Sequence, residues 1–469
     1  QPSIQMLAQG EIERIDATSR RILHEVGILV ENRDALELFQ DAGAKVDVEK
    51  KLVKISPDVI DSAIEKCEPY VSLYGRGDRE PLSVGGANTY FGTTGFPTNL
   101  LDHETGKYRS CLYEDLVTAT RLADVLNPPD YILPNIGATD IPAEYVDLYE
   151  FKAAVTNTGK HIQAQAQGKD NLRKIIAMAE YVAGGTERFK EKPFFSILVT
   201  LTSPLNLRPD STELIIEGAA EGLPLFIESG PMSGATSPAT LASTLITANA
   251  ELLSSIVLAK QVNSRVPVIY ASWARTLDMK TGSVCVGAPE FGMLRVGTTQ
   301  MAKFYNLPSG GGGTLTDSKW VDAQMGAELL STSLLPMLCG TNLIQGMGLL
   351  GGMNSASLEA MAISSEIISY VLRIKKGIRV NEDTANIGIF KEVGPLGNFL
   401  TTQHTLDHFR KEMWTPTGFD RSAITVGEDN ASSHFENHTK HAIREALATH
   451  QPPDVPEDCD KKLDEIIHG

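Results

Sequence analysis

The sequence predicts a (β/α)8 TIM barrel with an N-terminal helical cap and a C-terminal extension. Two observations predict this fold. From about residue 85, short runs of β-forming or apolar residues recur, and a polar turn and a longer helix-like segment follow each run. Eight such strand–helix units repeat roughly every 30–40 residues, which is the pattern of a closed parallel barrel.

The eight predicted strands are short and mostly apolar. In chain order they are TYFG at 89–92, YILPNIG at 131–137, HIQAQA at 161–166, FFSILVTLT at 194–202, PLFIES at 224–229, PVIYAS at 267–272, LPSG at 307–310 and TNLIQG at 341–346. The clearest helices span 114–126, 171–184, 240–262, 321–335 and 358–377. A doubly wound open sheet is the alternative. It usually carries a G-x-G-x-x-G turn after its first strand, and the sequence has none there.

We expect three parts along the chain. Residues 1–85 contain a helical segment at 12–28 and mixed short elements, and they form the N-terminal cap. Residues 86–378 form the barrel. Residues 379–469 contain HTLDHFRKEM and an acidic last helix at 458–469, and they form an extension that packs on the barrel or on a partner.

The composition argues against several classes of protein. With 42 basic and 59 acidic residues the formal charge is −17, which disfavours nucleic acid as a partner. No uninterrupted apolar run reaches the roughly 18–20 residues of a membrane span, and the first residues lack a signal-peptide pattern, so a cytoplasmic protein is expected. The five cysteines are scattered and form no C-x-x-C motif, so neither disulfides nor a zinc site is expected.

A run of four glycines, Gly310, Gly311, Gly312 and Gly313, lies in LPSGGGGTLTDSKW at 307–320. A nucleotide-binding P-loop needs its lysine directly after the last glycine, whereas Lys319 comes six residues later, so no nucleotide is expected. The run lies at the carboxyl end of the seventh strand, where barrel enzymes build their sites. Glycine there would allow a ligand or partner to approach the backbone, and a turn that needs positive φ angles is the alternative.

The carboxyl ends of the other strands supply candidate site residues. The catalytic candidates are Glu228 and Gln345, and the substrate-binding candidates are Tyr90, Phe91, Gln163, Gln165, Thr200, Thr202, Tyr270, Trp273 and Arg275. Alternate strand residues point outward, so about half of these are expected to be packing residues. Glu228 follows four apolar or proline residues, and a buried carboxylate there must be paired, hydrogen-bonded or protonated, so a salt bridge or helix cap is the alternative. Aromatic faces beside a carboxylate favour a methylated ammonium ligand.

Three stretches resemble the trimethylamine methyltransferase (MttB) superfamily: GGGGTLTDSKWVDAQMGAE at 310–328, LIQGMGLLGG at 343–352 and GPLGNFLTTQHTLDHFR at 394–410. The resemblance runs through most of the chain. It implies a (β/α)8 barrel that moves a methyl group from a methylated amine to the Co(I) corrinoid of a separate small protein. The trimethylamine enzymes contain pyrrolysine near the seventh strand, whereas this sequence has only standard residues there, as in the branch that includes glycine betaine methyltransferases.

The resemblance therefore favours glycine betaine as substrate, with carnitine, proline betaine and choline as alternatives, and a corrinoid-binding protein as partner of a homo-oligomer. Arg275 and His404 are candidate donors to a substrate carboxylate. The glycine run together with Asp317 is the expected approach of the corrin ring, and no D-x-H-x-x-G motif for a corrinoid of the chain's own is present. A non-catalytic binding protein for quaternary amines is the second hypothesis. An unrelated barrel lyase or aldolase is the third, but the eight strand runs contain no Lys or Asp at their ends.

Overall fold

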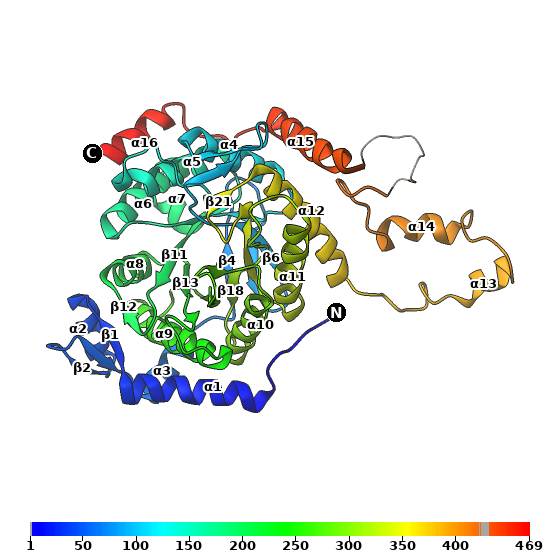
Figure 1. Cartoon of the computed structure of the whole chain (residues 1–469). Helices are drawn as coiled ribbons and strands as arrows, with labels where there is room; N and C mark the ends of the chain where they lie inside the picture. Colours follow the sequence, from blue (N-terminus) through cyan, green and yellow to red (C-terminus); the bar gives the residue numbers. More distant parts are fainter. Residues whose placement is uncertain (1, 422, 424–430) are drawn as a thin grey trace.

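The computed structural model describes residues 2–421, 423 and 431–469, without the side chains of 431–436. Its centre is a closed barrel of eight parallel strands (Figure 1). These are β6 (Tyr90–Thr93), β9 (Tyr131–Ile132), β10 (His161–Ala164), β11 (Phe195–Leu201), β13 (Leu225–Ser229), β15 (Val268–Ser272), β18 (Ser309–Gly312) and β19 (Leu343–Met347). The predicted fold class is confirmed, and each of the eight predicted runs overlaps a barrel strand.

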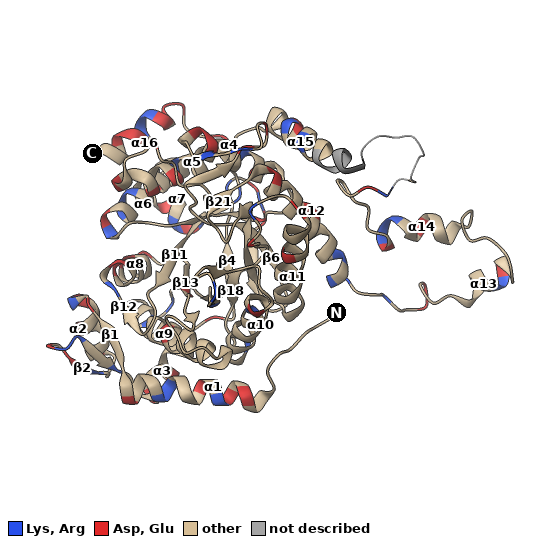
Figure 2. Cartoon of the chain, viewed as in Figure 1, with Lys and Arg blue, Asp and Glu red and all other residues tan. Residues whose placement is uncertain are grey.

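One helix layer surrounds the barrel. It consists of α4 (Tyr113–Val125), α5 (Val146–Asn157), α6 (Lys169–Ala183), α7 (Thr186–Glu191), α8 (Pro209–Ala220), α9 (Leu241–Val262), α10 (Pro289–Phe304), α11 (Ala323–Cys339) and α12 (Leu358–Lys375). Charged residues lie mainly on the outer helices and loops (Figure 2). Helix α9 is long and apolar enough to span a membrane, but 78% of its apolar window is buried within the protein, as in a core helix.

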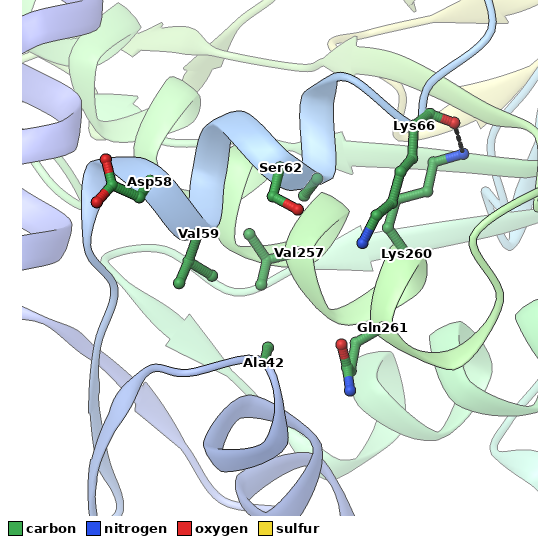
Figure 3. A pocket seen from close by; sticks show the side chains of 9 residues that line it. Ala42, Asp58, Val59, Ser62, Lys66, Val257, Lys260 and Gln261 are labelled. Atoms are coloured by element: carbon green, nitrogen blue, oxygen red, sulfur yellow. Dashed lines mark hydrogen bonds between the residues drawn. The ribbon is translucent and has the colours of Figure 1, made fainter.

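The N-terminal segment packs on the outside of α9. It contains α1 (Gln9–Arg21), the π-helix Ile22–Val26, α2 (Arg33–Asp41) and α3 (Pro57–Ile64), with β1 (Ile28–Val30), β2 (Lys45–Asp47) and β3 (Leu52–Lys54). Figure 3 shows a pocket of about 170 Å³ at this seam, where Val59 and Ser62 of α3 face Val257 of α9. Lys260 Nζ of α9 donates to the carbonyl of Lys66, just after α3 (3.0 Å), and so links the two helices. The seam fixes the cap to the barrel, on the outer side of α9.

The two ends of the barrel are built differently. At the amino end, the hairpin β4 (Tyr70–Leu73) and β5 (Leu82–Gly85) closes the interior, because Val71 and Val84 pack on interior residues such as Phe226. At the carboxyl end, short strands from the loops form two small sheets. These are β14 (Met232–Ser233) with β16 (Arg275–Leu277) and β17 (Val284–Cys285), and β20 (Leu349–Leu350) with β21 (Ser355–Ala356), β7 (Asn99–Leu101) and β8 (Tyr108–Ser110). Another short strand, β12 (Asn206–Leu207), pairs with β1.

After α12 the chain leaves the barrel. Helices α13 (Ile387–Val393) and α14 (Gln403–Glu412) project away from it (Figure 1). Helix α15 (Ala431–Thr449) returns to pack on α12 and α4, and α16 (Cys459–His468) packs on α5 and α6. The projecting segment therefore lies apart from the barrel mouth.

Candidate active site

A cavity of about 410 Å³ opens at the carboxyl end of the barrel, the end at which barrel enzymes carry their sites. Strand ends and the loops after them supply its walls. The lining residues are Thr94, Gly95, Phe96, Gln165, Leu198, Thr200, Leu201, Glu228, Gly230, Trp273, Arg275 and Met353. Five of the predicted candidates are thus brought together in the lining of one cavity: Gln165, Thr200, Glu228, Trp273 and Arg275.

Glu228 is the only carboxylate among the residues that line this cavity. It is 7% exposed, and its Oε1 accepts a hydrogen bond from Thr200 Oγ1 on the neighbouring strand (2.9 Å). Burial raises its pKa to about 7, while the Thr200 hydrogen bond, the charges of Arg275 and Arg295 and the nearby Trp273 indole oppose the rise. Its Oε2 has no hydrogen-bond partner among the described residues. Glu228 is therefore held in place with one oxygen left for a ligand, and a nearby cation would favour its ionised form.

Two arginines lie near this carboxylate. Arg275 lines the cavity, and its Nη1 donates to the Trp273 carbonyl (3.2 Å) while its Nε is unpaired among the described groups. Arg295 of α10 is 1% exposed, lies over the Phe291 ring (4.8 Å) and donates to the Ala274 carbonyl. Burial and the charge of Arg275 together lower the pKa of Arg295 to about 9, while the charge of Glu228 opposes the fall. Two guanidinium groups beside one carboxylate leave an excess positive charge, which suits an anionic group on a ligand.

The apolar part of the cavity lining consists of two aromatic residues, two leucines and one methionine. Trp273 is 6% exposed, lines the cavity and packs on Phe291, and its indole N–H has no acceptor among the described residues. Phe96, from the loop after β6, and Met353, from the loop after β20, line it as well. Aromatic faces attract a quaternary ammonium through the ring quadrupole, by roughly 0.5–2 kcal/mol each. The cavity therefore places aromatic faces and a carboxylate in the same lining as a guanidinium group.

Three glutamines carry further unpaired polar atoms. Gln165 Oε1 is in the cavity wall, whereas Gln163 and Gln345 are buried in the barrel interior. Gln345 Oε1 accepts from the Tyr131 hydroxyl at 3.4 Å, and its Nε2 has no partner within the described chain. Buried polar groups are normally hydrogen-bonded, so this concentration of unpaired atoms at one end of the barrel is typical of a site for a polar ligand.

The structure corrects three of the predicted aromatic site residues. Tyr270 points outward and donates to Asn249 of α9 (2.7 Å), and Phe91 packs outward against residues of α11 and α12. Tyr90 packs on residues near the amino end of the barrel, and its hydroxyl accepts from the Ser83 N–H (3.2 Å). Side chains alternate between the two faces of a strand, so Tyr270 faces away from the interior that its neighbour Ala271 lines.

His404 also lies elsewhere. It belongs to α14 in the projecting segment, where its ring lies against that of His408 (4.3 Å between centroids). His404 therefore does not line the cavity, whereas Arg275, the other predicted donor, does.

The glycine run does not leave open space for a corrin ring. A Cβ at Gly310 would meet Phe226 at 2.3 Å, and one at Gly312 would meet Phe291 and Trp273 at 2.7 and 2.8 Å. Atoms of the protein also fill the positions beside Gly311 and Gly313, including the Ser272 and Thr332 carbonyls. The four residues are buried. They let interior side chains pack against the backbone, and at Gly312 the side chain so placed is Trp273.

Asp317 connects two loops at the carboxyl end of the barrel. It accepts a hydrogen bond from the Val286 N–H (2.9 Å), and a Cβ at Gly352 would lie 3.5 Å from its carboxylate. Burial raises its pKa, and backbone hydrogen bonds from Val286 and Gly287 oppose the rise. Asp317 therefore ties the loop before α10 to the loop after β18, and this contact explains its burial without a corrin ring.

Among the residues at or beside the cavity that were not predicted from the sequence are Phe96, Arg295 and Met353. Phe96 follows the first strand in TTGFP, and a search of the residues after the strand, beyond its last position, would have found it. Arg295 lies in an apolar helix, where a buried arginine calls for a partner. For Met353, which has φ +73°, no sequence signal is evident.

Comparison with known proteins agrees with this architecture. The family described as trimethylamine methyltransferase (MTTB) matches residues 1–468. The trimethylamine methyltransferase MttB of Desulfitobacterium hafniense (strain DSM 10664 / DCB-2) is 33% identical over 460 residues, which cover 97% of this chain and 92% of that protein. The glycine betaine methyltransferase of Desulfitobacterium hafniense (strain Y51) is 31% identical over 473 residues, which cover 99% and 97%.

A solved structure shares the fold. The monomethylamine methyltransferase (MtmB) of Methanosarcina barkeri aligns with a TM-score of 0.52 and 12% identity, over 97% of this chain and 92% of that one. At this identity the likeness concerns the fold alone, whereas the family match and the relatives above 30% identity extend along nearly the whole sequence. The chain therefore belongs to the trimethylamine methyltransferase (MTTB) family of enzymes.

Proposed function

We propose that this enzyme transfers a methyl group from a small zwitterionic quaternary amine, glycine betaine first, to the Co(I) corrinoid of a separate protein. The single observation that carries the proposal is the pairing, in one cavity, of Glu228 and Trp273 with Arg275. The first two suit the trimethylammonium group, and Arg275 suits a carboxylate. The family and a glycine betaine methyltransferase among the relatives support the same reading.

The chemistry of a quaternary amine suits these residues. In R–N(CH3)3+ the nitrogen already carries a positive charge, so loss of a methyl group leaves a neutral tertiary amine. The leaving group needs no proton, and Glu228 therefore acts as a counter-ion and not as a general acid. Trimethylamine lacks both the permanent charge and the carboxylate, so it would leave the Arg275 side of the cavity unused.

The protein's own contribution is to hold the substrate in one orientation. Arg275 fixes the carboxylate end, while Trp273, Phe96 and Glu228 hold the trimethylammonium end in a dry, largely apolar pocket. Holding the methyl group in line with its acceptor lowers the barrier because orientation is settled before reaction. Excluding water strengthens the charge contacts on both sides.

In this proposal the corrinoid approaches the cavity from outside the barrel. A cavity of about 410 Å³ is near the lower end of the sizes of small-molecule sites and suits a small amine, whereas the glycine run holds no cradle for a macrocycle. A partner-borne Co(I) corrinoid supplies the nucleophile that accepts the methyl group. Phe96, Gly230 and Met353, which come from the loops around the cavity, are the residues that would face it.

A substrate panel tests this proposal. We expect cob(I)alamin methylation to be fastest with glycine betaine, slower with choline and slowest with trimethylamine. Arg275→Gln should reduce the preference for glycine betaine over choline by roughly 10–100-fold, because a charged hydrogen bond contributes about 1.5–3 kcal/mol. The matched control is Arg173→Gln. Arg173 of α6 forms an exposed ion pair with Glu217 of α8, far from the cavity lining, so its substitution should leave the preference unchanged. Equal rates with trimethylamine and glycine betaine would refute the assignment.

A further inference from the structure

A second cavity, of about 720 Å³, lies at the amino end of the barrel and is called the basic cavity here. Its lining comes from three stretches: 127–130 directly before β9, 369–376 at the end of α12, and 410–417, where the chain returns from α14. Lys375, in this lining, donates to the Ala87 carbonyl just before β6 (2.9 Å). The substrate cavity opens at the carboxyl end of the barrel, so the two cavities are separate.

The lining is rich in basic side chains, which belong to Arg373, Lys375, Lys376, Arg410 and Lys411. A smaller cavity of about 190 Å³ shares three of these residues and adds Arg379 and Glu412. Figure 2 shows basic residues at the ends of α12 and α14. With Asp130, the two cavities have six basic and two acidic residues, a net charge of +4 in a chain whose formal charge is −17. A positive site on so acidic a protein favours an anionic ligand.

Three of the cations have no carboxylate partner among the described residues. The side chains of Lys376 and Lys411 make no hydrogen bond or ion pair within the described chain. Arg410 lies over the Phe409 ring, with 5.3 Å between its guanidinium carbon and the ring centroid. Like charges gathered around one cavity repel one another, and a bound anion would remove this repulsion.

The other two cations are held in place by backbone carbonyls. The Arg373 guanidinium donates to the Glu412 carbonyl (2.6 Å) and the Gly377 carbonyl (3.0 Å), and it lies 3.5 Å from the Glu412 carboxylate. Lys375 is half-buried, and burial and the charge of Lys303 lower its pKa. Arg373 and Lys375 are therefore positioned before a ligand arrives.

Asp130 is the only acidic residue among those that line the basic cavity. Its Oδ2 accepts a hydrogen bond from the Phe91 N–H of β6 (2.7 Å). Burial raises the pKa of Asp130, while this hydrogen bond and the charge of Lys160 oppose the rise. One carboxylate, bound to the backbone of β6, offsets only one of the five positive charges around the cavity.

An apolar wall lies beside these charges. It consists of Trp414, Met413 and Leu372. The indole is held in one orientation, because its Nε1 donates to Ser369 Oγ (3.0 Å) and the Tyr370 ring packs edge to face on it (5.2 Å). At about 720 Å³ the cavity is larger than a phosphate ion requires and lies within the range of drug-sized ligands. The expected ligand therefore has a ring or an apolar body in addition to its charge.

We propose that the basic cavity binds a small organic phosphate with at least two negative charges. Guanidinium and ammonium groups are the side-chain groups that recognise phosphate, and Trp414 supplies a face for the body of the ligand. The rest of the chain has a net charge of −21, which would repel nucleic acid or an acidic protein surface beyond the cavity. A small molecule contacts only the basic lining and avoids this repulsion.

Isothermal titration calorimetry on the full chain tests the proposal, with ADP, pyrophosphate and adenosine as probes in magnesium-free buffer. ADP has both the charge and the ring, so it should bind at one site per chain and about tenfold more tightly than pyrophosphate. Adenosine has no charge and should not bind detectably. Citrate, whose charge comes from carboxylates, should bind more weakly than ADP.

Two double variants separate the cavity from the charge of the whole chain. Lys376→Glu with Lys411→Glu should weaken ADP binding at least about tenfold, because two charged contacts are lost and replaced by repulsion, with an unchanged circular dichroism spectrum. The matched control is Lys192→Glu with Lys461→Glu, which changes the net charge equally at exposed lysines outside both cavities and should leave ADP binding unchanged. Trp414→Leu should weaken binding of ADP and spare pyrophosphate.

The single variant Lys411→Gln is the second measurement if the first double variant misfolds, and it should weaken ADP binding about threefold or more. Absence of binding by both ADP and pyrophosphate at millimolar concentration would overturn the proposal. So would equal losses in the two double variants, or citrate that binds more tightly than ADP. The inference does not rest on the methyl-transfer reaction, because binding is measured without substrate or corrinoid.

Discussion

At the scale of single residues, the surroundings of Glu228 leave one of its two carboxylate oxygens available to a ligand. One of its oxygens is committed to Thr200, and the other is unpaired among the described groups. Burial alone would keep the group protonated, and its pKa of about 7 reflects opposing contributions from Thr200 and the two arginines. A cationic ligand that approaches the free oxygen would shift this balance toward the carboxylate. In the proposed function, selectivity for a cationic ligand therefore depends on the Glu228 oxygen that has no hydrogen-bond partner among the described residues.

Substitutions of Glu228 and Trp273 test the ammonium subsite. Glu228→Gln keeps the shape but removes the charge, so it should weaken binding of glycine betaine and spare 3,3-dimethylbutanoate, in which an uncharged tert-butyl group replaces the trimethylammonium group and the carboxylate is kept. Trp273→Ala should remove a cation–π face and weaken betaine binding by about 0.5–2 kcal/mol beyond its effect on the analogue. Isothermal titration calorimetry of the folded variants measures both ligands.

Tyr270→Phe is the control for these two substitutions. It breaks the outward hydrogen bond to Asn249 and should lower the free energy of unfolding by about 1–3 kcal/mol, with both affinities unchanged. If Glu228→Gln and Trp273→Ala cost the same affinity for betaine and for the analogue, the ammonium subsite lies elsewhere.

At the scale of elements, the sequence predicted the strands better than the direction of their side chains. Each barrel strand is a short, nearly continuous run, so its existence is visible locally. The face on which Tyr270 or Phe91 lies depends on register across the barrel, which neighbouring residues alone do not fix. Helices α5 and α10 lack a clear apolar stripe because they also bury polar residues, among them Glu150, Lys152 and Arg295, and they were not singled out.

Strand β18 shows a second limit of sequence reasoning. The glycine run lies beside the cavity, since Gly312 packs against Trp273, but the reason for the glycines depends on which side chains fill the space around them. Gly312→Ala should place a Cβ within 2.7–2.9 Å of Phe291 and Trp273 and push the indole out of position.

We expect Gly312→Ala to lower the free energy of unfolding by about 1–3 kcal/mol, as overpacked cores do, and to weaken betaine binding in calorimetry. Gly326→Ala in α11 is the matched control, because nothing lies within 4 Å of its added Cβ. It should bind betaine normally and be up to about 1 kcal/mol more stable, since alanine favours a helix. Normal betaine binding by a folded Gly312→Ala protein would show that the position of Trp273 does not matter for the substrate.

At the scale of the whole molecule, the two ends of the barrel have different tasks. The carboxyl end gathers unpaired polar groups and aromatic faces around one cavity, whereas residues 378–412 leave the barrel near its amino end. The extension was expected to pack on the barrel or on a partner. Helices α15 and α16 pack on barrel helices, whereas α13 and α14 project away from the barrel, and this difference depends on contacts between distant residues that no local pattern in the sequence records.

The central claim is that the cavity both binds a quaternary amine and releases one of its methyl groups. Single-turnover reaction with methyl-labelled glycine betaine and cob(I)alamin tests it most directly, with NMR used to quantify the products. We predict one methylcobalamin and one dimethylglycine for each betaine consumed, with Trp273→Ala slowing both together. Betaine that binds in the cavity but stays unchanged in the presence of cob(I)alamin, with no methylcobalamin formed, would contradict the claim and make the protein a binding protein for quaternary amines.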